Sequence, residues 1–139
     1  MEHSVVVTMF KKYSSDDLVN IICGALTGCS YWCDFDFEPN DYAEAKQRLK
    51  DRGNNDICYE EVLVEILEGG KSLWLKDNEE DEMYELTLDK LLNGIRDNCE
   101  DRPDDCDIDE GDDETMDCII QYALFGDVLF GWLKGEWLC

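Results

Sequence analysis

The spacing of apolar residues changes repeatedly along this chain, and this change restricts the fold more than any other feature. Between positions 31 and 38 apolar residues fall at every second position, which is typical of a half-buried strand with an acidic outer face. The apolar side carries Tyr31, Cys33, Phe35 and Phe37. Trp32 is expected on the opposite side, either as an exposed anchor for a partner or covered by a helix. Elsewhere apolar residues recur every three or four positions, as on a helix. The mixture predicts an α+β fold.

Turn and capping residues divide the chain into elements. The first expected helix begins at a capping box of Ser14 and Asp17 and ends at Gly28. Further helices are expected over 41–52, 57–68 and 113–125. Another begins at the cap Thr87 and has Leu88, Leu91, Leu92 and Ile95 on its apolar face. The expected strands are 4–10, 31–38 and a hairpin of 72–76 with 83–86. The prediction is one domain over residues 1–139, with a small, mostly antiparallel sheet of about four strands covered by four to five helices.

Length and composition support a folded domain. The chain has 139 residues, of which 44% are hydrophobic, so it can bury a core. We find no basic segment before the short apolar run at the N-terminus, and no apolar run approaches the length of a membrane span. We therefore expect a cytoplasmic protein whose cysteines stay reduced.

Acidic residues are concentrated between Asp97 and Asp117, where twelve of twenty-one residues are Asp or Glu. We expect residues 97–112 to form a long acidic, cysteine-containing loop. The whole chain has 35 acids and 12 bases, a formal charge of -23. The electrostatic field of this negative charge attracts a cationic partner and repels DNA or RNA, so direct nucleic-acid binding is not expected. The alternative is that the acids only keep the domain soluble.

Metal binding has two candidate sites. A calcium loop starting at Asp105 does not match an EF-hand, which needs Gly at its sixth position and Glu at its twelfth, where this chain has Glu110 and Met116. A weak, nonspecific site for a divalent cation in this loop stays open as an alternative. A structural zinc site is the better hypothesis, because four thiolates can close a tetrahedral site. Its predicted ligands are Cys29, Cys33, Cys99 and Cys106. Alternatively, Cys33 and Cys58 fill the core and the other thiols are incidental, with Cys23 and Cys118 lying off the apolar stripes of their helices.

Catalysis has little support in the sequence. The single histidine, His3, lies near a terminus, so a histidine-based triad cannot be assembled. Glycine-rich phosphate-binding signatures are also absent. We predict that the protein is not an enzyme.

Three stretches carry a family resemblance: residues 30–34 (SYWCD), 84–92 (YELTLDKLL) and 119–126 (IIQYALFG). They resemble a family of small acidic proteins encoded in prophages and mobile elements of gut bacteria. Similar proteins from such settings include inhibitors of type II CRISPR effector nucleases, and at least one of these carries zinc. Residues 99–118 and the tail after Gly131 do not match the family.

The resemblance implies an anti-CRISPR protein that acts in the bacterial host cytoplasm, binds the nuclease through an acidic surface and blocks DNA loading or cleavage. The predicted partner-binding residues are Asp34, Asp36, Glu38, Glu79, Glu80, Asp81, Glu82, Asp104, Asp105, Asp107, Asp109, Glu110, Asp112, Asp113 and Glu114. Two alternatives stay open: a metal-stabilised phage structural or accessory protein, and a DNA mimic directed at another nuclease or DNA-binding protein.

Overall fold

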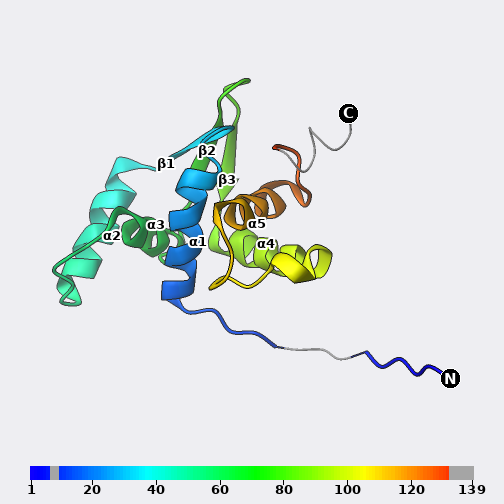
Figure 1. Ribbon diagram of the computed structural model, residues 1–139. Coiled ribbons are helices and arrows are strands. Elements are labelled where there is room, and N and C mark those ends of the chain that lie inside the picture. The colour runs from blue at the N-terminus through cyan, green and yellow to red at the C-terminus, as the bar shows by residue number, and fades with distance from the viewer. Residues whose placement is uncertain (7–9, 132–139) are drawn as a thin grey trace.

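The computed structural model describes residues 1–6 and 10–131 and has the expected α+β composition. The α-helices are α1 (Ser15–Gly28), α2 (Pro39–Asp51), α3 (Tyr59–Glu68), α4 (Leu88–Asp101) and α5 (Asp113–Phe125). The strands are β1 (Cys33–Asp36), β2 (Leu73–Asp77) and β3 (Met83–Leu86), and a short 3-10 helix, η1, spans Pro103–Asp105. Figure 1 shows the sheet above a group of helices.

The sheet is antiparallel, with β2 in the centre and the order β1-β2-β3. Because side chains alternate along a strand, one face carries the row Phe35–Leu75–Tyr84 and the pair Leu73–Leu86. Leu73, Leu75 and Leu86 are completely buried on this face, where β2 contacts α3 and β3 contacts α5. The inner face of the sheet therefore contributes directly to the main core.

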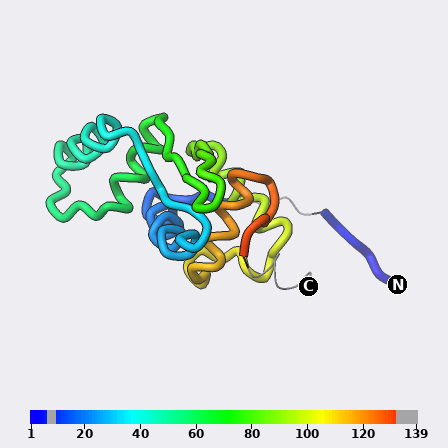
Figure 2. The backbone as a smooth tube through the Cα atoms, turned by 90° about the horizontal axis from the view of Figure 1, so that it is seen from above, coloured from blue at the N-terminus to red at the C-terminus, as the bar shows by residue number. Residues whose placement is uncertain are grey.

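Helix α5 lies at the centre of the helical layer. It packs against both α1 and α4, while α3 packs against α1 and α2. Every residue from Thr115 to Tyr122 is buried, so this segment of α5 is surrounded by protein on all sides. Figures 1 and 2 place α2 at one end of the molecule, away from α4 and α5.

Several local predictions are confirmed. Ser14 and Asp17 form the expected capping box of α1, and the Thr87 side chain accepts a hydrogen bond from the Lys90 N–H at the start of α4. Such caps satisfy backbone donors that lack partners within the helix. The hairpin of β2 and β3 is present, and α5 has the predicted bounds. Gly126 ends α5 with a φ of 74°, a left-handed conformation that glycine adopts without strain.

The predicted fourth strand at residues 4–10 is not found in the described part of that segment. Residues 4–6 and 10 belong to no strand, and residues 7–9 lie outside the described residues. Val5, Val6 and Phe10 are 82%, 96% and 91% exposed. β-branched residues favour a strand only where packing and a pairing partner are available. The sheet therefore has three strands in the described part of the chain, rather than about four.

The predicted strand at 31–38 is shorter than expected, because residues 29–32 form a turn and β1 begins at Cys33. Tyr31 is consequently 52% exposed, although the alternation placed it on the apolar side. Trp32 is 4% exposed and stacks on Phe130 at a centroid distance of 4.6 Å. The second alternative for Trp32, a covered side chain, is the one that the structure shows.

Two further expectations about α4 and the acidic loop were wrong. Leu92 is 39% exposed, because the buried face of α4 passes instead through Leu91, Gly94, Ile95 and Asn98. The acidic segment 97–112 is not a continuous loop: α4 extends to Asp101 and η1 follows. Ile108 is buried within this segment, which anchors the remaining loop to the core.

Candidate functional site

The predicted partner-binding acids are almost all available to solvent. Fourteen of the fifteen are exposed, and only Asp105 is half-buried. They occupy three places: the tip of the β2–β3 hairpin, the outer face of β1 with the start of α2, and the 104–114 loop, which runs from η1 to the first turn of α5. The hairpin tip projects from the top of the molecule in Figure 1, whereas the yellow-to-gold loop after α4 runs along its lower side. The fifteen residues therefore do not form one continuous patch.

The acidic hairpin tip, residues 79–82, is held by a buried carboxylate. Asp77 is 4% exposed, and its Oδ1 accepts hydrogen bonds from the backbone N–H groups of Glu79, at 2.7 Å, and Glu80, at 3.2 Å. Asp81 adopts a left-handed φ of 58°, a conformation that Asp tolerates better than most residues. Asp77 thus shapes the turn, and the four acids beyond it point into solvent.

The outer face of the sheet carries the second acidic group. Asp34 lies opposite Lys76, and Asp36 lies opposite Trp74. Both carboxylates are exposed, as the alternation predicts. Glu38 is the exposed N-cap residue of α2 and lies two residues after the end of β1.

The 104–114 loop contains acids with structural roles. Asp105 accepts a hydrogen bond of 2.6 Å from the Thr115 hydroxyl and forms an ion pair with Arg102. Asp112 caps α5, and the hydrogen bond from the Thr115 N–H holds the pKa of its carboxyl below the usual value. The remaining predicted acids of this loop are exposed. Asp107 Oδ1 accepts a hydrogen bond of 2.9 Å from the Asp109 N–H. Sequence reasoning treated all of these acids alike, but Asp105, Asp107 and Asp112 also hold the loop together.

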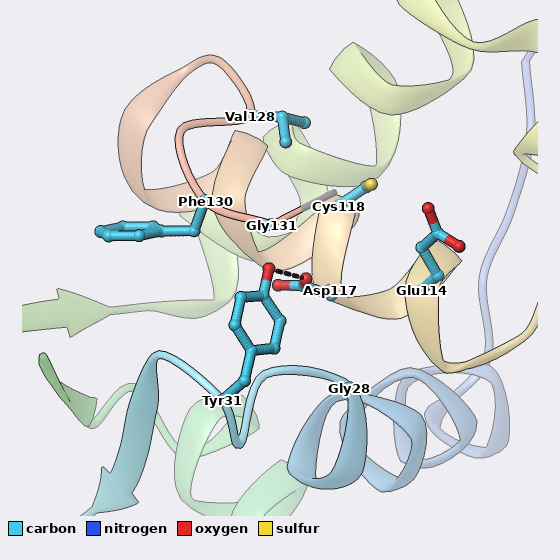
Figure 3. Close-up of a pocket in the computed structure, with 8 residues that line it drawn as sticks. All are labelled: Gly28, Tyr31, Glu114, Asp117, Cys118, Val128, Phe130 and Gly131. Carbon is cyan, nitrogen blue, oxygen red and sulfur yellow. Dashed lines mark hydrogen bonds between the residues drawn. The ribbon is translucent and has the colours of Figure 1, made fainter. Parts of the chain in front are cut away.

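The most completely hydrogen-bonded carboxylate is one that the sequence did not single out. Asp117 of α5 is 5% exposed and lies among neutral donors. Its Oδ1 accepts from the Trp32 indole N–H at 2.8 Å, from the Gln121 amide at 2.9 Å and from the Cys29 thiol at 3.4 Å. Its Oδ2 accepts from the Tyr31 hydroxyl at 2.6 Å, the bond drawn in Figure 3. Buried charges require such partners, because burial removes their water.

Gln121 extends this network to the segment after α5. Its Oε1 accepts from the backbone N–H groups of Leu129 and Phe130, both at 2.8 Å, and its Nε2 donates to the Phe130 carbonyl at 3.2 Å. A cavity of about 210 Å³ lies beside the network, between the end of α1, the start of α5 and residues 128–131. Figure 3 shows the Tyr31 hydroxyl pointing toward Asp117, and both residues line this cavity.

The environment of Asp117 keeps two neighbouring groups protonated. Burial and the hydrogen bond to Asp117 raise the pKa of the Tyr31 hydroxyl well above its usual value. A hydrogen bond to Cys33, followed by burial and the charge of Asp117, raises the pKa of the Cys29 thiol. A thiol held in its protonated form is a poor nucleophile and a poor metal ligand. The network therefore acts as a structural tie between α1, β1, α5 and the following loop.

The four cysteines of the predicted zinc site lie in two pairs. Cys29 and Cys33 are both buried at the junction of α1 and β1. Cys99 and Cys106 are half-buried near η1, and the Cys99 thiol faces the Cys106 carbonyl at 3.8 Å. No group of three or more His, Cys, Asp and Glu side chains is placed to hold a metal ion within residues 1–6 and 10–131. Binding of zinc stays a prediction.

Cys58 and Cys118 differ from the sequence-based alternative. Cys58 was a core candidate, but it is exposed. It is the N-cap residue of α3, which begins at Tyr59, and so it lies on the surface. Cys118 is 1% exposed even though it lies off the apolar stripe of α5, since α5 is covered on all sides there. Cys23 is exposed, as expected from its position on α1.

His3 lies in the exposed N-terminal segment. None of the described helices has both the length and the apolar character that a membrane crossing needs. Comparisons with protein-family models, with curated proteins and with solved structures found no match for this chain. The resemblance to phage-encoded inhibitors thus stays a prediction, and function must be argued from the surface.

Proposed function

We propose that this protein is an inhibitor that binds a type II CRISPR effector nuclease through its acidic surface and blocks DNA loading or cleavage without catalysis. The supporting observation is the state of the predicted acids. Fourteen of the fifteen are exposed, and of the fifteen only Asp81 and Asp105 pair with a base in the described part of the chain. Their charge is therefore free to act on a partner.

An RNA-guided nuclease is a suitable target for such a surface. It holds its guide–target duplex and the displaced DNA strand in positively charged channels. A folded polyanion with a net charge of -23 competes with the DNA phosphates for those channels. This mode of inhibition needs shape and charge and no reacting group.

The projecting hairpin is the part of the molecule best suited to enter such a channel. Its four acids, Glu79, Glu80, Asp81 and Glu82, follow one another in sequence, and the turn that carries them is fixed by Asp77. A preformed turn loses little conformational entropy on binding, so more of the electrostatic attraction appears as affinity. We propose that the hairpin tip and the neighbouring face of β1 form the main contact and that the 104–114 loop contributes a second one.

Size-exclusion chromatography tests this function. The purified protein is mixed with a guide-loaded type II effector nuclease, with target DNA added either before or after the protein. Co-elution only when the protein precedes DNA supports a block of DNA loading, and co-elution in both orders with loss of cleavage supports a later block.

Absence of co-elution at low salt, with full cleavage activity, would contradict the proposal. Zinc content is measured in the same protein peak, because stoichiometric zinc without nuclease binding would favour a metal-stabilised phage accessory protein. Retention of a different nuclease or DNA-binding protein at low salt would instead favour the DNA-mimic alternative.

A further inference from the structure

The outer face of the sheet is not covered by any helix in the described part of the chain. The residues that point to this side are Asp34, Asp36, Trp74, Lys76, Met83 and Glu85. Trp74 is 36% exposed and Met83 is 44% exposed, in contrast to the completely buried Leu73 and Leu75 on the same strand. The helices that contact the sheet, α3 at β2 and α5 at β3, pack on the side of Leu73 and Leu75. An apolar centre with an acidic border is thus open to solvent.

Trp74 has a carboxylate on each side. It lies on the central strand, directly opposite Asp36 of β1 and directly opposite Glu85 of β3. Side chains at such positions are near neighbours, with Cβ atoms about 4.5–5.5 Å apart. Both carboxylates are held: Asp36 Oδ1 accepts from the Phe37 N–H at 2.8 Å, and Glu85 Oε2 accepts from the Ser72 hydroxyl at 2.6 Å. The indole therefore lies between two positioned negative charges.

We propose that Trp74, Asp36 and Glu85 form a receptor for an arginine side chain of a basic partner protein. This inference rests on the proposed function and names the chemical group that the outer sheet face recognises. A guanidinium stacks on an indole and also donates hydrogen bonds to carboxylates on either side. Lysine has a compact ammonium group and stacks less well, so the receptor prefers arginine.

Charge complementarity identifies the occupant. A second copy of this chain also carries a net charge of -23 and presents the same acidic border, so it is repelled. Among the residues of the three strands, the only base that points to this side is Lys76, which pairs with Asp81 at 3.6 Å. A cationic side chain from another protein therefore meets two carboxylates and an exposed aromatic ring.

Two peptides of equal charge provide the probe: twelve residues of alternating Arg and Gly, and the same length of alternating Lys and Gly. Isothermal titration calorimetry measures both affinities for the wild type, Trp74→Ala, Trp74→Phe and the double variant Asp36→Asn/Glu85→Gln. Leu92→Ala is the matched control, because Leu92 is 39% exposed on α4. Circular dichroism verifies that each variant is folded.

The wild type and Leu92→Ala are expected to prefer the Arg peptide by about two- to fivefold. Trp74→Ala should reduce this preference to about one while retaining salt-dependent binding of both peptides. Trp74→Phe should keep part of the preference for the Arg peptide. The double variant should bind both peptides more weakly, with the larger loss of affinity for the Arg peptide. In labelled wild-type protein, the Trp74 indole N–H resonance should shift with the Arg peptide.

Equal affinity of the wild type for the two peptides, or an unchanged preference for the Arg peptide in Trp74→Ala, would overturn the proposal of an arginine receptor. Self-association that depends on Trp74, seen by sedimentation, would overturn it in favour of a second copy as occupant. The proposed function is judged separately, by co-elution with the guide-loaded nuclease. If wild type co-elutes but shows no preference for arginine, only the receptor fails. If wild type prefers the Arg peptide but does not co-elute, only the nuclease assignment fails.

Discussion

The buried carboxylate of Asp117 accepts a hydrogen bond of 2.8 Å from the indole N–H of Trp32, a residue 85 positions earlier in the chain. The bond ties the turn after α1 to the middle of α5. Trp32 is held from a second side by Phe130, which stacks on its ring. Gln121 contacts both Asp117 and the backbone of Phe130. The turn after α1, helix α5 and the segment that follows α5 are therefore held together as one unit.

Replacing Asp117 with alanine is expected to destabilise the protein by about 3 kcal/mol. The change leaves the buried Trp32 N–H and one side of the Gln121 amide without their acceptor. Urea unfolding followed by circular dichroism measures the effect. Asp104→Asn serves as the control, because Asp104 is exposed and its replacement should change the free energy of unfolding by less than about 0.5 kcal/mol. Equal stability of the two variants would show that the network does not hold the fold.

Gly94 is predicted to be essential for the contact between α4 and α5. A Cβ atom at this position would lie 2.5 Å from the Ile119 carbonyl oxygen and 2.7 Å from the Ala123 Cβ. The Gly94→Ala variant must therefore separate the helices, and we expect a loss of about 1–3 kcal/mol despite the better helix propensity of alanine. Asn93→Ala is the control, since Asn93 is exposed on the same helix. A Gly94→Ala protein with a raised thermal midpoint would contradict this packing.

Stability is expected to fall at alkaline pH. Burial raises the pKa of the Cys118 thiol from 9.0 to about 12. Below pH 9 the thiol is protonated in both states, so its contribution is fully present; between pH 9 and 12 only the unfolded chain loses the proton. Stability therefore decreases with rising pH, by about 1.4 kcal/mol per pH unit for such a group. Tyr31, whose pKa is also raised, adds to the loss above pH 10.

The dependence is measured by urea unfolding between pH 8 and 10.5. Cys118→Ala should show a shallower decrease than wild type, whereas Cys23→Ala, at an exposed position on α1, should follow the wild-type curve. Identical slopes in all three proteins would rule out Cys118 as a source of the alkaline instability.

Much of the fold was predictable because its local signals are strong. The capping box at Ser14, the cap at Thr87 and the spacing of Met116, Ile119 and Ile120 each specify a helix within a few residues of sequence. The strand predicted at 4–10 is absent from the described residues 4–6 and 10, because valines have local strand propensity while strand formation depends on pairing with distant residues. The prediction that Leu92 is buried was wrong for a similar reason, because spacing alone does not identify which side of a helix is covered.

The candidate site was predictable only in part. Exposure of Asp34 and Asp36 follows from alternation along a strand, and the hairpin acids follow from their position in a turn. Asp117 could not be distinguished from the other acids of its segment, because its donors come from residues 29–32 and from Gln121. The one available signal was its place on the predicted helix 113–125, beside apolar residues. Trp74 and Glu85 became neighbours of Asp36 only through the strand register.

Charge reversal at the hairpin tip is expected to weaken nuclease binding more than reversal in the loop. The triple variant Glu79→Lys/Glu80→Lys/Glu82→Lys removes the projecting charge and leaves Asp77 in place, so the turn should persist. We expect an affinity loss of at least about tenfold, mainly through slower association. Asp104→Lys/Asp109→Lys/Glu110→Lys is the matched variant, and it leaves the hydrogen-bonding carboxylates of Asp105, Asp107 and Asp112 in place. A larger loss of affinity in the loop variant would contradict this prediction and indicate that the loop makes the main contact.

Affinity for a guide-loaded type II effector nuclease, measured by calorimetry from about 0.1 to 0.5 M salt, tests whether charge drives recognition. The proposed function predicts binding at low salt that weakens by at least about tenfold over this range, with target DNA competing for the same complex. Binding that is independent of salt and unaffected by target DNA, or no binding at the lowest salt, would contradict it.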